Sequence, residues 1–281
     1  MITIARVTIG EAARRRVLWV LVVLAVVAVT ATGWGVERLV SLARESGVDE
    51  LQLKLGVSQI LIFIAFQFGF VLAMTAAFLG SPAIAGDLES GIALALLARP
   101  LRRSSYLLGR WLGLAVVILV YSMASGLLAI GVVGLVSGYS PPNPLVPVLY
   151  LAAQALVMLS LTVFLSTHLS PIAGGAVAVV AYGMAWMAGV LGHIGVALGA
   201  QGLAFISDVG RAILPTDGLW QGVIYGLEPA IVLAAAANQP GAQGNPFFAS
   251  EPPPPTFLAW TVVWVAIVLG LAILQLRRRE L

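Results

Sequence analysis

The sequence predicts an all-α polytopic membrane protein, from its composition and from the length and form of its apolar runs. Of the 281 residues, 60% are hydrophobic and only 10% are charged, and the mean hydropathy is +1.02. A soluble domain carries about 25% charged residues, which cover its surface in water. We therefore expect the chain to lie in a lipid bilayer.

Four windows contain no Asp, Glu, Lys or Arg, namely 17–36, 55–86, 111–207 and 252–276. One membrane-spanning helix needs about 20 apolar residues, so the third window holds several. Turn-forming segments at 137–147 and 170–175 divide it. The runs are continuous, without the alternation of a β-barrel strand, so helices are expected. The result is six spans near 17–36, 57–80, 108–136, 145–167, 172–192 and 257–276.

Residues 1–15 predict a helix that lies in the membrane interface. The segment "MITIARVTIGEAARR" is too short and too polar to cross, yet it places apolar Ile2 and Val7 beside Arg6 and Glu11. A frayed terminus is the alternative. The following apolar run is longer than the core of a signal peptide, about 7–15 residues, and no small-residue cleavage site follows it, so no cleaved signal is expected.

The positive charges predict that both termini lie in the cytoplasm, since Lys and Arg collect on that side of a membrane. With six spans, this orientation leaves only Arg38, Arg44, Lys54 and Arg211 outside. Region 193–256 then lies outside. Its apolar pieces are interrupted by "SDVGRAILPTDGLW" and by Glu228-Pro229, so we expect amphipathic or re-entrant helices there. Two further spans, giving eight in total, are the alternative.

Several types of chemistry have no residues to support them. The chain has no cysteine and no phosphate-binding G-x-x-x-x-G-K-[ST] loop. We expect no ionisable side chain within the spans, apart from His168 and His193 near their ends. Each histidine lacks carboxylate or thiol neighbours in sequence, so no metal site and no cofactor are expected in this chain. A membrane-embedded enzyme that acts on lipids through one of these histidines remains an alternative.

Two predicted spans carry aromatic and polar residues that suggest a translocation path. Helical spacing places Phe63, Phe66, Phe70 and Met74 on one face of the second span. The candidate path residues are Phe66, Gln67, Phe70, Met74, Tyr182 and Trp186. Ordinary helix packing or contact with lipid is the alternative for these side chains. Gly109 and Gly113 lie four residues apart, which favours a close helix contact.

The segment between the second and third spans is unusually polar. Asp87 and Glu89 precede an apolar stretch, 92–98, that is too short to cross a bilayer. Arg99-Pro100 ends this stretch, and Arg102 and Arg103 follow. A topology signal explains the arginines but neither the acids nor the apolar stretch. We therefore expect a helix along the inner membrane surface with charged ends.

This segment resembles the permease subunits of type-2 ATP-binding cassette exporters. In that family the second and third spans are joined by acid–x–x–Gly, a short apolar helix, Arg-Pro, a basic pair and aromatic–Leu–Leu–Gly–basic. The matching pieces here are Glu89 with Gly91, "IALALLA", Arg99-Pro100, Arg102-Arg103 and "YLLGR". The step from Glu89 to Gly91 is tighter than in the family, so Asp87 is expected to share the role of the acid. The element "LPTDGLW" after the fifth span adds support.

The resemblance implies a multi-pass permease in the plasma membrane of a prokaryote, without enzymatic activity of its own. It would pair with a second permease, identical or related, and each would rest on a separate cytoplasmic ATPase that binds ATP and magnesium. Residues 81–105 would be the coupling segment, with Asp87, Glu89, Gly91, Arg99, Pro100, Arg102 and Arg103 as its candidate residues. A scaffold that anchors an ATPase without transport is the remaining alternative, and no nucleic-acid partner is expected.

Overall fold

A computed structural model describes residues 1–14, 16–91, 102–231 and 244–278. Its regular elements are all helices, and six of them are long and apolar enough to cross a membrane. These are α2 (Arg16–Glu45), α3 (Glu50–Gly80), α6 (Arg103–Ser137), α7 (Leu145–Leu165), α8 (Pro171–Leu198) and α12 (Pro255–Arg278). The predicted all-α polytopic membrane fold is confirmed.

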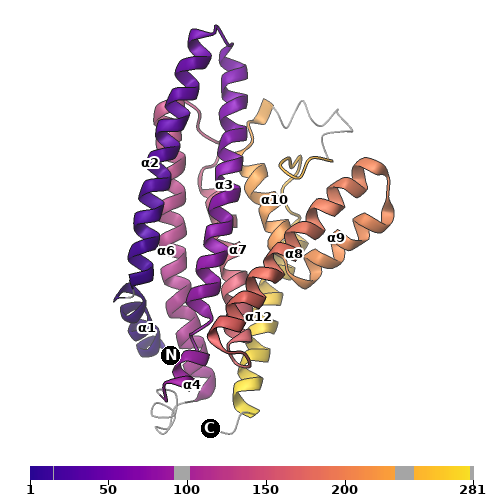
Figure 1. Cartoon of the computed structure of the whole chain (residues 1–281). Coiled ribbons are helices and arrows are strands. Elements are labelled where there is room, and N and C mark those ends of the chain that lie inside the picture. The colour runs from indigo at the N-terminus through magenta and orange to yellow at the C-terminus, as the bar shows by residue number, and fades with distance from the viewer. Residues whose placement is uncertain (15, 92–101, 232–243, 279–281) are drawn as a thin grey trace.

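Most of the long helices extend beyond the predicted spans. Helix α2 continues from the predicted end at 36 to Glu45, and α3 begins at Glu50 rather than near 57. Figure 1 shows the two helices rising together past the rest of the bundle. Charged residues such as Arg38 and Lys54 end a stretch that can lie in hydrocarbon, but they are good helix formers and do not end the helix.

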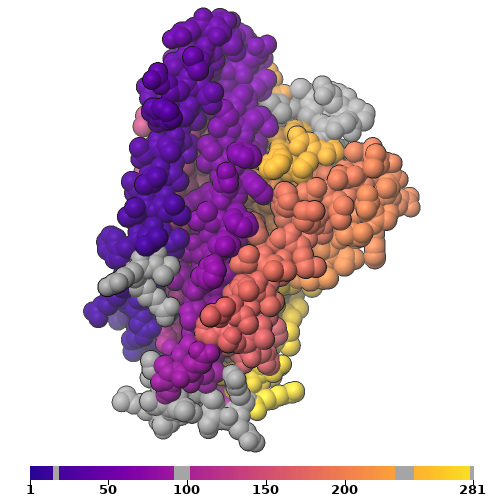
Figure 2. Space-filling model, in the orientation of Figure 1, coloured from indigo at the N-terminus to yellow at the C-terminus, as the bar shows by residue number. Residues whose placement is uncertain are grey.

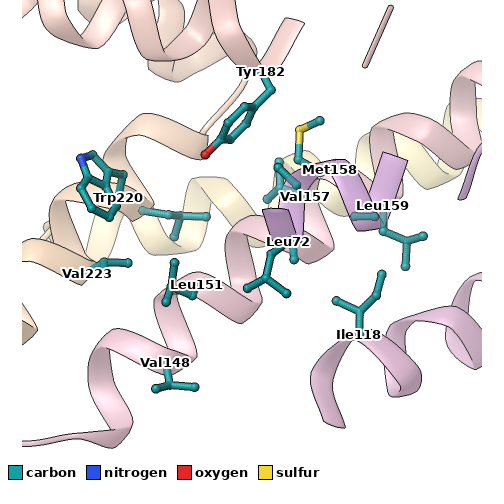
Figure 3. Packing of buried hydrophobic residues seen from close by; sticks show 14 of the residues in the cluster. Leu72, Ile118, Val148, Leu151, Val157, Met158, Leu159, Tyr182, Trp220 and Val223 are labelled. Carbon is teal, nitrogen blue, oxygen red and sulfur yellow. The ribbon is translucent and has the colours of Figure 1, made fainter. Parts of the chain in front are cut away.

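Helix α7 is the central helix of the bundle. It packs against α3, α6, α10 (Thr216–Leu227) and α12, and 61% of its most apolar window is buried. Leu151, Met158 and Leu159 of α7 belong to the same buried cluster as Leu72 of α3 and Ile118 of α6 (Figure 3). A helix that is apolar on all sides is expected at the core of such a bundle.

Two short elements lie at the end of the bundle where α12 also ends (Figure 1). Helix α1 (Ile2–Arg14) lies against the first turns of α6, and α4 (Ala85–Glu89) follows the end of α3. The apolar stretch 92–98 lies outside the described residues. The helix expected over the first fifteen residues is thus present, and it packs against protein.

Region 193–256 contains no described helix long enough to span. Helix α9 (Gln201–Ile213) doubles back along α8, and α10 then turns into the bundle. Figure 2 shows α8 and α9 projecting from the side of the molecule. A Cβ atom added at Gly218, Gly222 or Gly226 would collide with Phe257, Tyr150 or Pro147, respectively. A glycine on every turn therefore allows α10 to approach α12 and α7 closely.

Candidate functional site

The start of α6 carries a buried ion-pair network, which we call the Arg110 junction: Glu11, Asp87, Tyr106 and Arg110. One terminal nitrogen of the Arg110 guanidinium donates to Glu11 Oε2 and the other to Asp87 Oδ2. The Tyr106 hydroxyl donates to the same Asp87 oxygen. One arginine thereby joins α1, α4 and α6.

Burial makes this network energetically demanding. The side chains of Arg110 and Asp87 are 7% and 11% exposed, whereas that of Glu11 is 43% exposed. Removing one partner of a buried ion pair typically costs about 3–5 kcal/mol, because the other charge stays desolvated and unpaired. The buried pair between Arg110 and Asp87 should therefore be the stronger of the two. The pair between Arg110 and Glu11 is weaker because water screens it.

The expectation that the spans hold no charged side chain apart from histidines at their ends was wrong. Arg110 lies inside the third predicted span, 108–136, and is buried on α6. A charge in such a helix needs a partner, and that requirement is the sequence signal for the Arg110 junction. The identity of Glu11 as a partner has no local signal, because the two residues lie 99 positions apart.

Two glycines on α6 allow α1 to pack closely against it. A Cβ atom on Gly109 would lie 2.7 Å from Ile4 Cβ, and one on Gly113 would lie 2.6 Å from Thr8 Cβ. Both distances are below van der Waals contact. The close helix contact predicted from these two glycines is present, and it positions Glu11 beside Arg110.

The two acids of the predicted coupling segment have different surroundings. Asp87 is buried in the Arg110 junction, whereas Glu89 is exposed at the end of α4. Gly91 follows with a φ of +73°, a conformation that favours glycine over other residues. Asp87 therefore joins α4 to α6, whereas Glu89 is exposed among the residues that the structure describes.

The two arginines after the segment differ in the same way. Arg102 is exposed at the start of α6, whereas Arg103 donates from Nη1 to the carbonyl oxygens of Leu276 at 2.7 Å and Arg277 at 3.2 Å. Arg103 thus links the start of α6 to the last described turn of α12. Arg99 and Pro100 lie outside the described residues.

Four of the predicted path residues form an aromatic cluster between α3 and α8. The Phe66 and Trp186 rings are 5.3 Å apart and the Phe70 and Tyr182 rings 6.1 Å apart. The Phe66 ring also lies 5.6 Å from Trp220 of α10, a residue that the sequence did not single out for the path. Aromatic pairs at these distances are favourable.

The other two path residues lie apart from those contacts. Gln67 is exposed and lines a cavity between α2, α6 and α7. Met74 is half-buried one turn beyond Phe70 on α3. Tyr182 accepts a 2.8 Å hydrogen bond from Gln154 Nε2, which ties the cluster to α7.

The region opposite the Arg110 junction holds a second buried ion pair. Arg211 Nε of α9 donates to Asp217 Oδ2 of α10 at 2.8 Å, and the Asp217 side chain is 4% exposed. His193 contacts Gln221 at 3.0 Å between side-chain nitrogens. Among the residues that the structure describes, no group of three His, Cys, Asp or Glu side chains could hold a metal ion.

The family model for ABC-2 family transporter proteins matches residues 2–281, nearly the whole chain. The chain belongs to this family. A search of curated proteins finds no match.

Membership of the ABC-2 family makes the chain a multi-pass membrane subunit of an ABC transporter. Such a subunit is the membrane component of the transporter, is not itself catalytic, and works with a cytoplasmic ATPase. The resemblance stated from residues 87–110 is confirmed at this level.

Proposed function

We propose that the chain is the permease of an ATP-driven exporter and that it forms the translocation path as a dimer. Two copies of a separate cytoplasmic ATPase, loaded with ATP and magnesium, would drive it from the end that carries α1 and α4. Both termini would then lie in the cytoplasm of a prokaryotic cell. The observation that carries this proposal is the Arg110 junction, which joins three elements at that end.

The contact surface for the ATPase would be formed by the exposed charges at this end. Glu89 precedes the stretch 92–101 and Arg102 follows it, and both are exposed. They present opposite charges to a partner, and rim charges of this kind set the rate and orientation of association. Asp87 and Arg103 are engaged within the chain and would act as anchors.

Force on α4 would reach the membrane helices through Arg110. Movement of α4 displaces Asp87, and Asp87 shares the guanidinium with Glu11 of α1. Closure of the ATPases on ATP can shift the permease only if they bind one of its conformations more tightly. A rigid buried pair between α4 and α6 would convert that difference in affinity into movement of α6.

The aromatic cluster of Phe66, Phe70, Tyr182 and Trp186 would border the path. It joins α3 to α8 with apolar ring faces, and Tyr182 and Gln154 add hydrogen-bonding groups. Such a surface suits an amphipathic or apolar substrate.

Charge reversal at the exposed positions tests the coupling. The chain would be reconstituted in liposomes with the ATPase that co-purifies with it. We expect Glu89→Arg and Arg102→Glu each to reduce ATPase retention on the permease about tenfold and to abolish ATP-dependent flux. The control is Glu37→Gln. Glu37 is an exposed acid in the C-terminal part of α2, away from α1 and α4.

Membrane insertion must be checked separately, because Arg102 also contributes to the positive charge that orients the chain, whereas acids contribute little. Glu89→Arg is therefore compared with Glu89→Gln. Wild-type ATPase retention in Glu89→Arg and in a correctly inserted Arg102→Glu would contradict the proposal.

A further inference from the structure

A cavity of about 180 Å³ lies between α2, α3, α6 and α7. Its wall is built from small and apolar side chains, including Ala28, Ile64, Gly126, Ala129 and Leu151. Two residues of the lining, Leu24 of α2 and Phe70 of α3, are exposed. An apolar cavity of about 150 Å³ is large enough to hold benzene. This cavity therefore has room for one ring or a short alkyl chain.

The polar groups of the lining fall into two classes. The hydroxyl of Tyr121 donates to the Leu21 carbonyl oxygen at 3.1 Å, and that of Ser125 donates to the Tyr121 carbonyl oxygen. Gln67 and Thr32 also line the cavity, and neither side chain makes a hydrogen bond to any residue in the described part of the chain. The carboxamide of Gln67 therefore presents two donors and an acceptor that nothing in the described residues satisfies.

An unsatisfied carboxamide is unusual at the position that Gln67 is expected to take in the membrane. Helix α3 rises about 1.5 Å per residue, so Gln67 lies roughly 20 Å from the end of α3 at Gly80. The hydrocarbon core is about 30 Å thick, and residue 67 lies about midway along the predicted second span, 57–80, so we expect the amide to lie well inside the core. An unsatisfied amide costs several kcal/mol there. Phospholipid tails bring only methylene groups to this depth, so a bilayer lipid would not relieve that cost.

We propose that this cavity binds a lipid-soluble small molecule with a ring-sized apolar part and a hydroxyl or carbonyl group that pairs with Gln67. The ligand would reach the site from the bilayer between α2 and α3. Phe70 also contacts Tyr182 of the aromatic cluster, so the site adjoins that cluster. Binding at this cavity would require neither transport nor the ATPase.

Photolabelling of the protein in phosphatidylcholine liposomes tests the site. The probe is benzyl alcohol carrying a trifluoromethyl-diazirine group, and mass spectrometry locates the labelled residues. We expect label on wall residues such as Gly126 and Leu151, both of which are buried, and competition by plain benzyl alcohol.

Two variants distinguish the cavity from general contact with the probe. Ala129→Phe fills the cavity and should remove the label from the wall. The matched control is Leu128→Phe on the adjacent, exposed position of the same helix, which should leave it unchanged. Gln67→Leu changes an exposed side chain without filling the core. It should lower labelling about fivefold, which is the loss of affinity expected from one lost hydrogen bond.

Three results would overturn the proposal. The first is label confined to exposed positions, and the second is wall labelling that survives both Ala129→Phe and Gln67→Leu. The third is equal wall labelling by a phosphatidylcholine with a diazirine in its acyl chain, which would make the occupant an ordinary bilayer lipid.

Discussion

At the scale of single residues, Glu228 is a fully buried carboxylic acid whose burial is only partly offset by the backbone of Ala249. It directly follows α10 and is 0% exposed, and neither carboxylate oxygen has a hydrogen-bond partner within the described residues. Burial raises the pKa of Glu228 to about 8. Burial of the Tyr139 hydroxyl, together with the charge of Glu228, raises the pKa of Tyr139 to about 12.

This pKa predicts a pH-dependent stability. The folded state holds the Glu228 proton more tightly than the unfolded state, whose pKa is 4.5. The stabilising contribution of Glu228 is therefore fully present below about pH 4.5 and is lost as the pH rises to about 8, by up to roughly 4 kcal/mol. Thermal unfolding in detergent from pH 5 to 9 should show a falling midpoint for the wild type and a flatter profile for Glu228→Gln. Parallel profiles would exclude a buried, protonated Glu228.

The Arg110 junction predicts that the effects of Arg110→Met and Asp87→Asn on stability depend on each other. Arg110→Met leaves Asp87 buried without a cationic partner and should reduce stability by about 3–5 kcal/mol. Adding Asp87→Asn removes that charge and should restore more than half of the loss. The measurement is thermal unfolding of the four purified proteins, including Asp87→Asn alone. Additive losses in the double variant would mean that the two side chains do not interact.

At the scale of elements, the fit between α1 and α6 depends on glycine. A side chain at Gly113 would meet Thr8 Cβ and the Ala5 carbonyl oxygen, and backbone cannot yield as a flexible side chain can. A Cβ atom at Gly131, in contrast, would meet nothing within 4 Å. Both glycines lie on α6, so they form a matched pair.

We expect Gly113→Val to detach α1 from the bundle and Gly131→Val to leave it in place, because the two substitutions change helix propensity equally. Limited proteolysis at Arg6 and Arg14 reports the detachment, and cleavage in Gly113→Val should be at least tenfold faster than in Gly131→Val. Loss of α1 should also reduce transport, since it removes Glu11 from the Arg110 junction. Equal resistance of both variants to proteolysis would show that the packing of α1 does not require glycine at position 113.

At the scale of the whole molecule, the charge distribution predicts which end faces the cytoplasm. The chain has no cysteine, so single cysteines can be introduced without background. Ser46 lies between α2 and α3, and Ser104 lies in the first turn of α6 at the opposite end (Figure 1). In intact cells an impermeant thiol reagent should label Ser46→Cys and Ser250→Cys, and it should reach Ser104→Cys only after the cells are opened. Labelling of Ser104→Cys in intact cells would reverse the orientation.

The number and type of the spans follow from local properties of the sequence. Backbone groups in hydrocarbon must be hydrogen-bonded within their own segment, so each long apolar run becomes a helix whatever its neighbours are. Region 193–256 follows less directly from local sequence, because its described helices α9 and α10 are positioned by packing against α7, α8 and α12. The glycines at 218, 222 and 226 were a sequence signal for that packing.

The roles of the charged residues depend on tertiary packing. Asp87 and Glu89 lie two positions apart in similar sequence, yet one is buried against Arg110 and the other is exposed. Phe66 and Gln67 are adjacent, but they face an aromatic cluster and a separate cavity. Helical periodicity shows which residues share a face. What covers that face is decided by helices up to a hundred positions away, because burial and ion pairing depend on distances in space.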